Sequence, residues 1–486
     1  MISMPKIAIS LVRLLPVAAF LTWAPHGFCG LIALQSDVPA VIKRVAGTGV
    51  VKTLDASKYT LRIFTFVDGR SPQVTNVKPG GVWQLPDMVY AREAENGKWR
   101  VGNISAKEPN VIEAQTSYDT EATLERAAAY QPLPKAPAGW KIREVVRLSD
   151  FPVRMASDGK GTWMYIAMTN GDVWYVDVVA GTRKRILIGT DYLRGDGLSH
   201  LIQGIFLDKQ NRVYLSANER IEGETVMNEV TLFRAQANPK THEIAKPKSW
   251  FKTSYPWGIG AFNHGISKID IGPDGMMYVG SGSRTGAGEP GDIPHYSKAG
   301  ETDITACLWR LDPKSENPKL EIYARGLRNP FAFCWNNVGE MFSGDHGPDA
   351  DAPEELNLIK QGHHYGFPFQ FSDWTKKPYP YTPDIPKGLK IDLPIANYGP
   401  AEGGSKDKPL YSWQPHAAPT GLVFLNKGFP KSVQGKYLVS LFGNLLDVPE
   451  AGFKLLSLNL TKGKDGKYTM TSTKFLYPVA RPRSAC

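Results

Sequence analysis

Short runs of alternating apolar and polar residues recur along the chain, and few stretches show the spacing of an amphipathic helix. The run WMYIAM follows a polar turn at 158–161, and RVYLSA follows one at 208–211. Similar turns precede MMYVGS, EMFSGD and KYLVSL, at 273–275, 336–339 and 434–435. Alternation over five or six residues indicates half-buried strands, because successive side chains of a strand point to opposite faces.

The turn-and-strand unit returns roughly every 50 to 65 residues, and one longer gap before the last turn has room for a further unit. Units of this kind at a fixed period are typical of a β-propeller. The pattern therefore predicts an all-β protein whose main part, residues 140–486, is a six-bladed β-propeller, with five or seven blades as alternatives. We expect the first and last strands to share one blade, since closure removes exposed sheet edges.

The first part of the chain differs from this repeat. Residues 1–29 carry Lys6 and Arg13 around a short apolar run and end in small residues, as in a secretory signal peptide. We expect a periplasmic or secreted protein without stable membrane insertion, because no later stretch has the length of a membrane span. Residues 30–126 are predicted to form a small N-terminal β module of unknown role, and the proline-rich residues 127–139 a linker.

Composition and charge narrow the class of protein. With 42% hydrophobic and 21% charged residues, the 486-residue chain is globular. Its formal net charge is +10, but the basic residues are scattered and the cluster at 183–185 lies in no nucleic-acid motif. We expect no nucleic-acid partner, and attribute the excess charge to solubility or to attraction of anionic ligands.

The chain has four cysteines, Cys29, Cys307, Cys334 and Cys486. Loss of Cys29 with the signal peptide leaves an odd number, which excludes a fold built on disulfides. Cys307 and Cys334 lie in apolar runs, so they are either buried thiols or a disulfide pair.

Three segments, 262–282, 323–369 and 416–444, together resemble a known family. They contain FNHGISKIDIGPDG, then Gly-Leu-Arg-Asn-Pro, Gly-Pro, Glu-Leu-Asn-Leu and Tyr-Gly-Phe-Pro, and last HAAPTGLVF. This order and spacing resembles the PQQ-dependent soluble sugar dehydrogenases, of the soluble glucose and L-sorbosone dehydrogenase type. The resemblance covers 140–486 and leaves out the N-terminal module.

The resemblance implies an exported quinoprotein that oxidises a sugar or related alcohol by hydride transfer to PQQ and passes the electrons to a separate acceptor. It places the catalytic base at His264, because a neutral imidazole can take the substrate's hydroxyl proton. Arg328 would stabilise negative charge on the quinone, and Asn329 would lie beside the cofactor.

The same resemblance implies two calcium sites. The backbone carbonyls of Gly347 and Pro348 would bind a Ca²⁺ that also chelates PQQ, and oxygen donors of this kind suit calcium. Glu355 would bind a second, structural Ca²⁺ near Tyr365. From the residues alone, the adjacent Glu354 and Glu355 are equally well explained as a solvent-facing acidic pair.

Substrate and cofactor contacts are expected at three further positions. By the resemblance, His200 and Gln203 lie in a region that contacts substrate, and Lys427 is close to a place that supplies a cation for the three PQQ carboxylates. The expected arginines are missing after YLVSLFGN, so either Lys454, His416 or a residue of the insert at 372–411 replaces them, or affinity for PQQ is lost.

Two other functions remain as alternatives. One is a degenerate propeller that binds a sugar or a protein without redox activity, as the missing arginines suggest. The other is a metal-dependent lactonase-type hydrolase, which requires several carboxylates and Asn side chains around one ion in the channel.

Overall fold

The structure is a computed structural model of the whole chain. It describes the backbone of strands β1–β6 and residues 133–146, 148, 152–194, 200–259, 264–291, 300–348, 350–443 and 452–476. The signal peptide predicted at 1–29 lies outside these residues, so export stays a prediction. Within the described part, no helix is long and apolar enough to cross a lipid bilayer.

Residues from the predicted N-terminal β module form an antiparallel sheet of six strands in the order β1-β6-β5-β4-β2-β3. The role of this sheet and the boundaries of the module and the linker stay predictions. Its strands are β1 (Lys52–Asp55), β2 (Tyr59–Thr65), β3 (Gln73–Val77), β4 (Val89–Glu93), β5 (Trp99–Ile104) and β6 (Val111–Tyr118).

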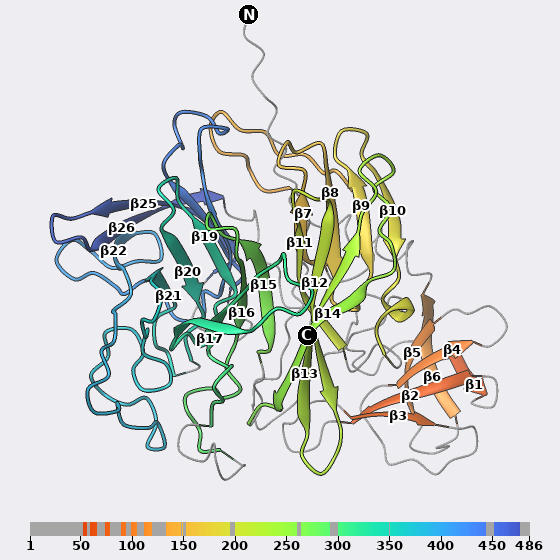
Figure 1. Cartoon of the computed structure of the whole chain (residues 1–486). Coiled ribbons are helices and arrows are strands. Elements are labelled where there is room, and N and C mark those ends of the chain that lie inside the picture. The colour runs from red at the N-terminus through yellow and green to blue at the C-terminus, as the bar shows by residue number, and fades with distance from the viewer. Residues whose placement is uncertain are drawn as a thin grey trace, which may run out of the picture.

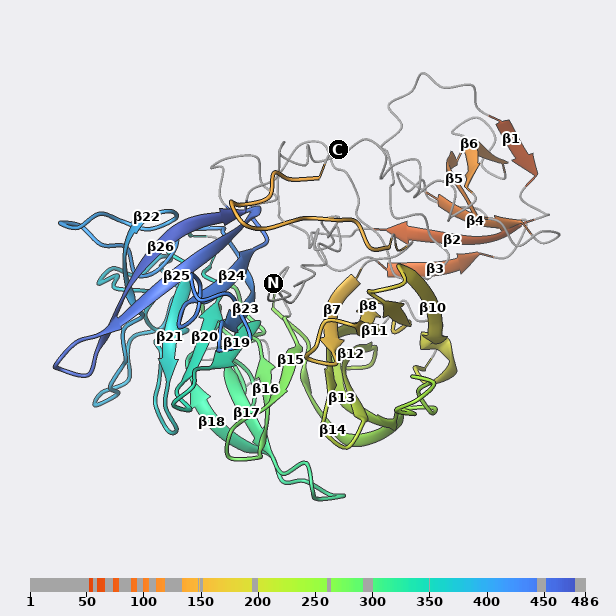
Figure 2. The same ribbon diagram turned by 90° about the horizontal axis from the view of Figure 1, so that it is seen from above.

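The remaining strands form five sheets that follow one another in chain order, which confirms the all-β propeller (Figures 1 and 2). The first two sheets are β7 (Pro152–Ser157), β8 (Trp163–Met168), β9 (Val173–Asp177) and β10 (Thr182–Leu187), then β11 (His200–Leu207), β12 (Arg212–Ile221), β13 (Met227–Gln236) and β14 (Lys248–Pro256). The third and fourth are β15 (Ile266–Ile271), β16 (Met277–Ser281), β17 (Cys307–Leu311) and β18 (Glu321–Arg325), then β19 (Ala332–Trp335), β20 (Met341–Asp345) and β21 (Glu355–Ile359). The fifth contains β22 (Ala396–Pro400), β23 (Pro419–Phe424), β24 (Tyr437–Leu441), β25 (Lys454–Lys462) and β26 (Tyr468–Leu476).

In the first four sheets the predicted polar turn joins the first two strands, and in the fifth it joins β23 to β24, so the sequence repeat corresponds to the blades. In the third sheet, the Asp274 carboxylate accepts a hydrogen bond from the Met276 amide at 3.1 Å. Gly275 takes a positive φ of 79°, which side chains rarely tolerate. These turns lie where the first strand of a blade ends.

The described residues contain five blades, one fewer than the predicted six. The long gap in the repeat, residues 340–433, was expected to hold the extra blade. Instead it contains strands β20 and β21 of the fourth sheet, β22 and β23 of the fifth, and extended loops. Strand β22 pairs in parallel with β26 at the outer edge of the fifth sheet. An insertion between two blades therefore produced the irregular spacing.

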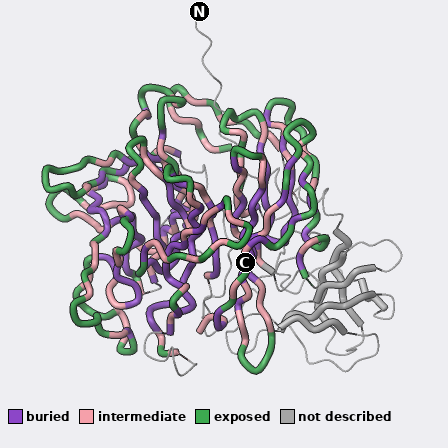
Figure 3. Tube along the Cα trace, in the orientation of Figure 1, coloured by how far each residue is buried: buried purple, intermediate pink, exposed green. Residues whose placement is uncertain are grey.

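The hydrophobic core lies between consecutive sheets. One cluster of buried side chains joins the first and second sheets, and further clusters join the second to the third, the third to the fourth and the fourth to the fifth. Figure 3 shows buried residues concentrated along these strands and exposed residues along the connecting loops. Cys307 and Cys334 are buried free thiols within these clusters, so the alternative of a disulfide between them is wrong.

The two ends of the propeller meet in a different way from the one predicted. In the described residues, β7–β10 form one sheet and β22–β26 another, so the first and last strands share no blade there. The segment before β7 packs Val145, Val146 and Leu148 against the first sheet. Trp140 of this segment meets Phe475 of β26 edge to face, at 5.2 Å between ring centroids. This segment therefore joins the first blade to the last.

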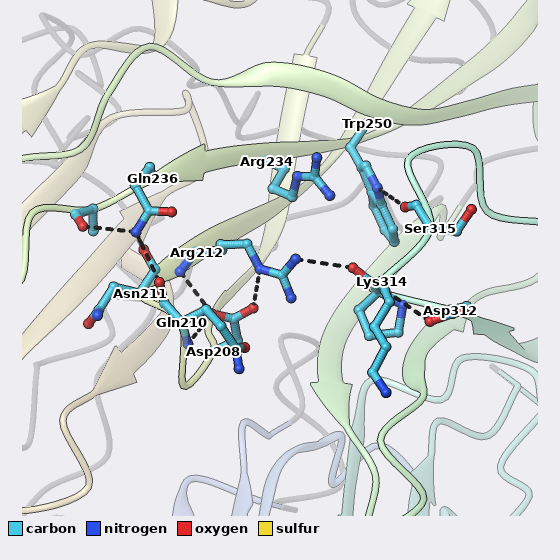
Figure 4. A network of polar contacts seen from close by, with 12 residues as sticks. Asp208, Gln210, Asn211, Arg212, Arg234, Gln236, Trp250, Asp312, Lys314 and Ser315 are labelled. Atoms are coloured by element: carbon cyan, nitrogen blue, oxygen red, sulfur yellow. Dashed lines mark hydrogen bonds and ion pairs between the residues drawn. The ribbon is translucent and has the colours of Figure 1, made fainter.

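A polar network links the second and third sheets at the end where the repeated turns lie (Figure 4). The Arg212 guanidinium pairs with Asp208 at 2.6 Å and also donates to the Pro313 carbonyl at 3.2 Å. The Trp250 indole donates to the Ser315 carbonyl at 2.9 Å. This end of the molecule is held by side chains that bind the turns of the neighbouring blade.

Near the centre of the propeller, Arg154 of β7 joins strands that are far apart in sequence. Its guanidinium donates to the carbonyls of Thr420 at 3.0 Å, Phe331 at 3.1 Å and Gln203 at 3.4 Å. It also lies 4.5 Å from the centre of the Phe331 ring. Desolvation lowers the Arg154 pKa to about 10, so the side chain remains charged at neutral pH.

We predict that Arg154→Met lowers the free energy of unfolding by roughly 2–4 kcal/mol, because three carbonyls lose a charged donor while the side-chain volume is largely kept. Urea unfolding measures the difference. The matched control is Lys184→Met, whose exposed pair with Glu243 should contribute little. Equal stabilities of the two variants would show that Arg154 does not hold the centre together.

Candidate functional site

His264 lies directly before β15, at the end of the propeller opposite the repeated turns. Its backbone amide and its ring Nδ1 both lie 3.1 Å from the carbonyl oxygen of Ser283, which follows β16. Desolvation, with the positive charge of Arg328 nearby, lowers the His264 pKa well below its usual value. The imidazole is therefore neutral at physiological pH, as a proton acceptor must be.

Arg328 is 4% exposed and lies in the loop between β18 and β19. Its guanidinium donates to the Gly286 carbonyl and to the Gly347 carbonyl, each at 2.7 Å. Its backbone carbonyl accepts from the Ser283 amide at 2.7 Å. Arg328 and His264 are thus tied to the same residue, and the site contains a buried positive charge beside a neutral base.

Asn329 lies across Gly282 from His264. A Cβ atom on Gly282 would come within 2.3 Å of the His264 Cβ and 3.0 Å of the Asn329 Oδ1, so only glycine permits this approach. Asn329 is 5% exposed, and its Oδ1 is buried without a hydrogen-bond partner among the described residues. A bound ligand with an O–H or N–H group could satisfy this oxygen.

His346 belongs to the site, although no motif in the sequence pointed to it. Its Nδ1 lies 3.0 Å from the Asn329 amide nitrogen and accepts its proton, while Nε2 donates to the Pro419 carbonyl at 3.0 Å. Desolvation lowers its pKa to about 4, so this histidine is also neutral. His346 thereby fixes Asn329 and links the fourth blade to the fifth.

Three carboxylates beside these residues are buried. Asp345, Glu354 and Glu355 are 2%, 3% and 7% exposed, so the expectation of a solvent-facing acidic pair is wrong. Asp345 accepts the amides of Arg328 and Asn329, at 2.8 and 2.5 Å. Burial raises the pKa of all three, that of Glu354 to about 8.

The calcium site expected at Gly347 and Pro348 does not fit these contacts. The Gly347 carbonyl already accepts from the Arg328 guanidinium, and a second cation at the same oxygen would be repelled. The Gly347 amide donates to Glu354 at 2.9 Å. In the described residues, no group of three or more His, Cys, Asp or Glu side chains is arranged to hold a metal ion.

The second expected calcium site is also not assembled. Glu355, at the start of β21, accepts from the Ser372 amide at 2.7 Å and from the Asn357 side chain at 3.0 Å. The Tyr365 hydroxyl instead donates to the Leu358 carbonyl, near the other end of β21, and the ring lies in the core. The structure therefore places Tyr365 apart from Glu355.

Of the two expected substrate residues, Gln203 has a structural contact. With its amide oriented to satisfy both neighbours, it donates to the carbonyls of His264 and Ile266 at 2.9 Å each. It therefore holds the backbone that carries the base. The backbone of His200 begins β11 at the same end of the propeller, but its side chain lies outside the described residues, so its substrate role stays a prediction.

The structure does not bring Lys427 to the site. Pro419, at the start of β23, contacts His346, whereas Lys427 is exposed in the turn after β23 ends. A strand of six residues spans about 20 Å, so Lys427 lies at the opposite end of the blade. Lys454 forms a largely buried ion pair with Glu402, which neutralises this alternative cation.

His416, the other proposed replacement for the missing arginines, also has an acidic partner. Its Nε2 lies 2.6 Å from the Asp351 carboxylate, and the Asp351 side chain is 75% exposed. Asp351 is thus a surface residue.

Comparison with known proteins agrees with the sequence resemblance. The family model described as Glucose / Sorbosone dehydrogenase matches residues 150–446, more than half of the chain. In Arabidopsis thaliana, the HIPL1 protein is 24% identical over 256 residues and the HIPL2 protein 24% identical over 211 residues. These matches cover 47% and 37% of this chain, and 36% and 29% of the relatives, so the chain spans about a third of their length.

Solved structures with a similar chain path include two aldose sugar dehydrogenases. The PQQ-bound form from Streptomyces coelicolor has a TM-score of 0.47 at 18% identity, covering 70% of this chain and 86% of that one. The soluble enzyme from Escherichia coli, in the apo form, has a TM-score of 0.47 at 16% identity, covering 66% and 85%. Similarity at this level assigns neither a cofactor nor a substrate to the present chain.

The raised pKa of Glu354 predicts a stability that falls with pH. The folded protein holds this proton up to about pH 8, whereas an unperturbed glutamate releases it near 4.5, so rising pH favours the unfolded state. Each such carboxyl contributes a slope of up to about 1.4 kcal/mol per pH unit. The histidines with lowered pKa affect stability only below about pH 6.5, so the carboxyls dominate above it.

Glu354→Gln keeps an oxygen for the Gly347 amide and should flatten this slope between about pH 6.5 and 8. Urea unfolding across this range, with a chelator present, measures it. The control Glu316→Gln changes a side chain that is 74% exposed and should leave the slope as in the parent. Equal slopes for the parent and Glu354→Gln would mean that Glu354 is ionised in the folded protein.

Proposed function

Because the chain belongs to the glucose/sorbosone dehydrogenase family, we propose that it oxidises a sugar or related alcohol, with PQQ as the hydride acceptor and a separate protein or small molecule as the final electron acceptor. The observation that carries the proposal is the neutral His264 beside the buried Arg328 and the unsatisfied oxygen of Asn329.

His264 acts as the general base in this proposal. Oxidation of an alcohol removes a hydride from carbon and a proton from oxygen, and the proton needs an acceptor in the same step. Because Nδ1 is directed at the Ser283 carbonyl, Nε2 is the nitrogen that takes the proton. When bound, PQQ supplies the two-electron acceptor for the hydride.

Arg328 and Asn329 prepare the site for this chemistry. The guanidinium is fixed by two carbonyls, so its charge is available without reorganisation to stabilise negative charge that develops nearby. It also keeps His264 from being protonated before the reaction. The Asn329 Oδ1 offers a hydrogen-bond acceptor that a hydroxyl or ring N–H of a bound molecule would satisfy.

Two groups near His264 fit a quinone. The Asn329 Oδ1 would accept a hydrogen bond from it, and the Arg328 guanidinium would stabilise negative charge on it. The three carboxylates of PQQ find less support, because Lys427 lies at the other end of the blade and Lys454 pairs with Glu402. This favours, as a second candidate, a propeller that binds a sugar or a protein without redox activity. Calcium enters no step of the proposal, since the Gly347 carbonyl is bonded to Arg328.

Reconstitution of the purified full chain with PQQ, with and without CaCl₂, tests the proposal by the reduction of a dye in the presence of aldose sugars. We expect His264→Ala to keep the quinone absorbance and to lose about 10² to 10⁴ in kcat/KM, the usual contribution of a general base. The matched control is His363→Ala, a partly exposed histidine paired with Asp392 away from this cluster, which should retain full activity.

The outcomes separate the candidates. Turnover in His264→Ala equal to that of the parent would contradict the assigned base. Sugar binding by the parent without quinone binding would favour the redox-inactive propeller. A strict calcium requirement would show that Arg328 releases the Gly347 carbonyl on binding.

A further inference from the structure

We infer that Ser283 is a positioning residue that fixes which ring nitrogen of His264 carries the proton, leaving Nε2 as the proton acceptor. The catalytic meaning of this inference rests on the proposed function. Its evidence is the hydrogen bonding of the protein itself, so it can be tested without sugar or cofactor.

Two oxygen atoms of Ser283 face the same nitrogen of His264. The carbonyl oxygen and the side-chain Oγ each lie 3.1 Å from Nδ1. A carbonyl oxygen can only accept, and the single hydroxyl hydrogen of Ser283 is donated to the Thr285 carbonyl at 2.7 Å. Both oxygens therefore act as acceptors toward the ring, so Nδ1 must carry the hydrogen and Nε2 the lone pair.

The segment that presents these oxygens is held firmly. Ser283 is 1% exposed, and its amide donates to the Arg328 carbonyl at 2.7 Å. Thr285, whose carbonyl accepts the Ser283 hydroxyl, donates its amide and its hydroxyl to the half-buried Glu301 carboxylate at 2.9 and 2.6 Å. The hydroxyl of Ser283 thus has a fixed acceptor and cannot readily turn its hydrogen toward His264.

Arg284, which lies between Ser283 and Thr285, anchors the same segment through further hydrogen bonds. Arg284 is 0% exposed, and its guanidinium donates to the carbonyls of Pro256 at 2.9 Å and Gly300 at 2.6 Å. Its amide donates to Glu301 at 3.1 Å. Residues 283–285 are therefore hydrogen-bonded to Pro256 of the second blade, to the loop at 300–301 and to Arg328.

A serine at this place has a different effect from a carboxylate. Neutral oxygens orient the ring but add no negative charge to stabilise its protonated form. With Arg328 nearby, His264 stays neutral, so the orientation is obtained without raising the fraction of imidazolium in the resting protein. A carboxylate at position 283 should instead stabilise the protonated ring and raise the fraction of imidazolium.

Long-range ¹H–¹⁵N NMR of the full chain labelled at histidine nitrogen measures the tautomer, with His264 assigned by the loss of its signals in His264→Gln. We expect the Nδ1–H form in the parent. Ser283→Ala removes Oγ and leaves the carbonyl, so the ratio of Nδ1–H to Nε2–H should fall by up to about tenfold, and kcat should fall in proportion to the fraction of Nδ1–H, while KM stays similar. Ser283→Asp should raise the His264 pKa by about 1–3 units.

Ser281→Ala is the matched control, because Ser281 is 0% exposed and its hydroxyl donates to the Ile304 carbonyl at 2.7 Å. It should leave the tautomer ratio and kcat unchanged. If Ser283→Ala does not fold, the parent spectrum and Ser283→Thr, which keeps the hydroxyl, provide the test, and both should show Nδ1–H.

An Nε2–H tautomer in the parent, or a ratio unchanged by Ser283→Ala, would overturn the inference. A parent with the Nδ1–H tautomer but no sugar oxidation after reconstitution would instead refute the proposed function and support the positioning role. The two failures are therefore distinguishable.

Discussion

The buried carboxylate of Asp345 holds the candidate site together. It accepts the backbone amides of Arg328 and Asn329 and so fixes the loop between β18 and β19 against the end of β20. The Arg328 carbonyl then accepts from the Ser283 amide, and Ser283 orients His264. A single carboxylate thus determines, through successive backbone hydrogen bonds, where the proposed base lies.

Burial gives these groups their charge states. Burial raises the pKa of a carboxyl that has few cations nearby, and it lowers the pKa of an imidazole. The raised pKa of Glu354 and the lowered pKa values of His264 and His346 are the two sides of this effect. Arg328 supplies a positive charge that two backbone carbonyls hold in place. The site therefore combines one fixed cation with neutral bases.

The sequence predicted the fold well because the polar turns and alternating strands are local features. All five turns join two consecutive strands of a blade, and the core lies between the blades as a propeller requires. The described residues contain five of the predicted six blades, because the insertion between the fourth and fifth blades has the length of a repeat but not its strands. Spacing alone does not distinguish a blade from loops of equal length.

The candidate site was predicted in part. His264, Arg328 and Asn329 meet, because each directly precedes the first strand of a blade and these strands begin at one end of the propeller. His346 and Ser283 were missed, since both follow a second strand and show their role only when the neighbouring blade is in place. Their signal was available in principle: in a propeller, residues before a first strand and after a second strand share one end.

The same rule explains why Lys427 was misplaced. It follows a first strand, and residues in that position lie with the repeated turns, as Arg212 and Asp208 do in the second blade.

The two ends of the propeller thus have different roles. At the turn end, charged side chains pair with one another and with neighbouring turns, as with Arg212 and Pro313. At the other end, Asn329 keeps a buried acceptor without a partner among the described residues. An unsatisfied polar atom costs stability wherever it lies, and this one lies beside a neutral base, where the proposed ligand would satisfy it.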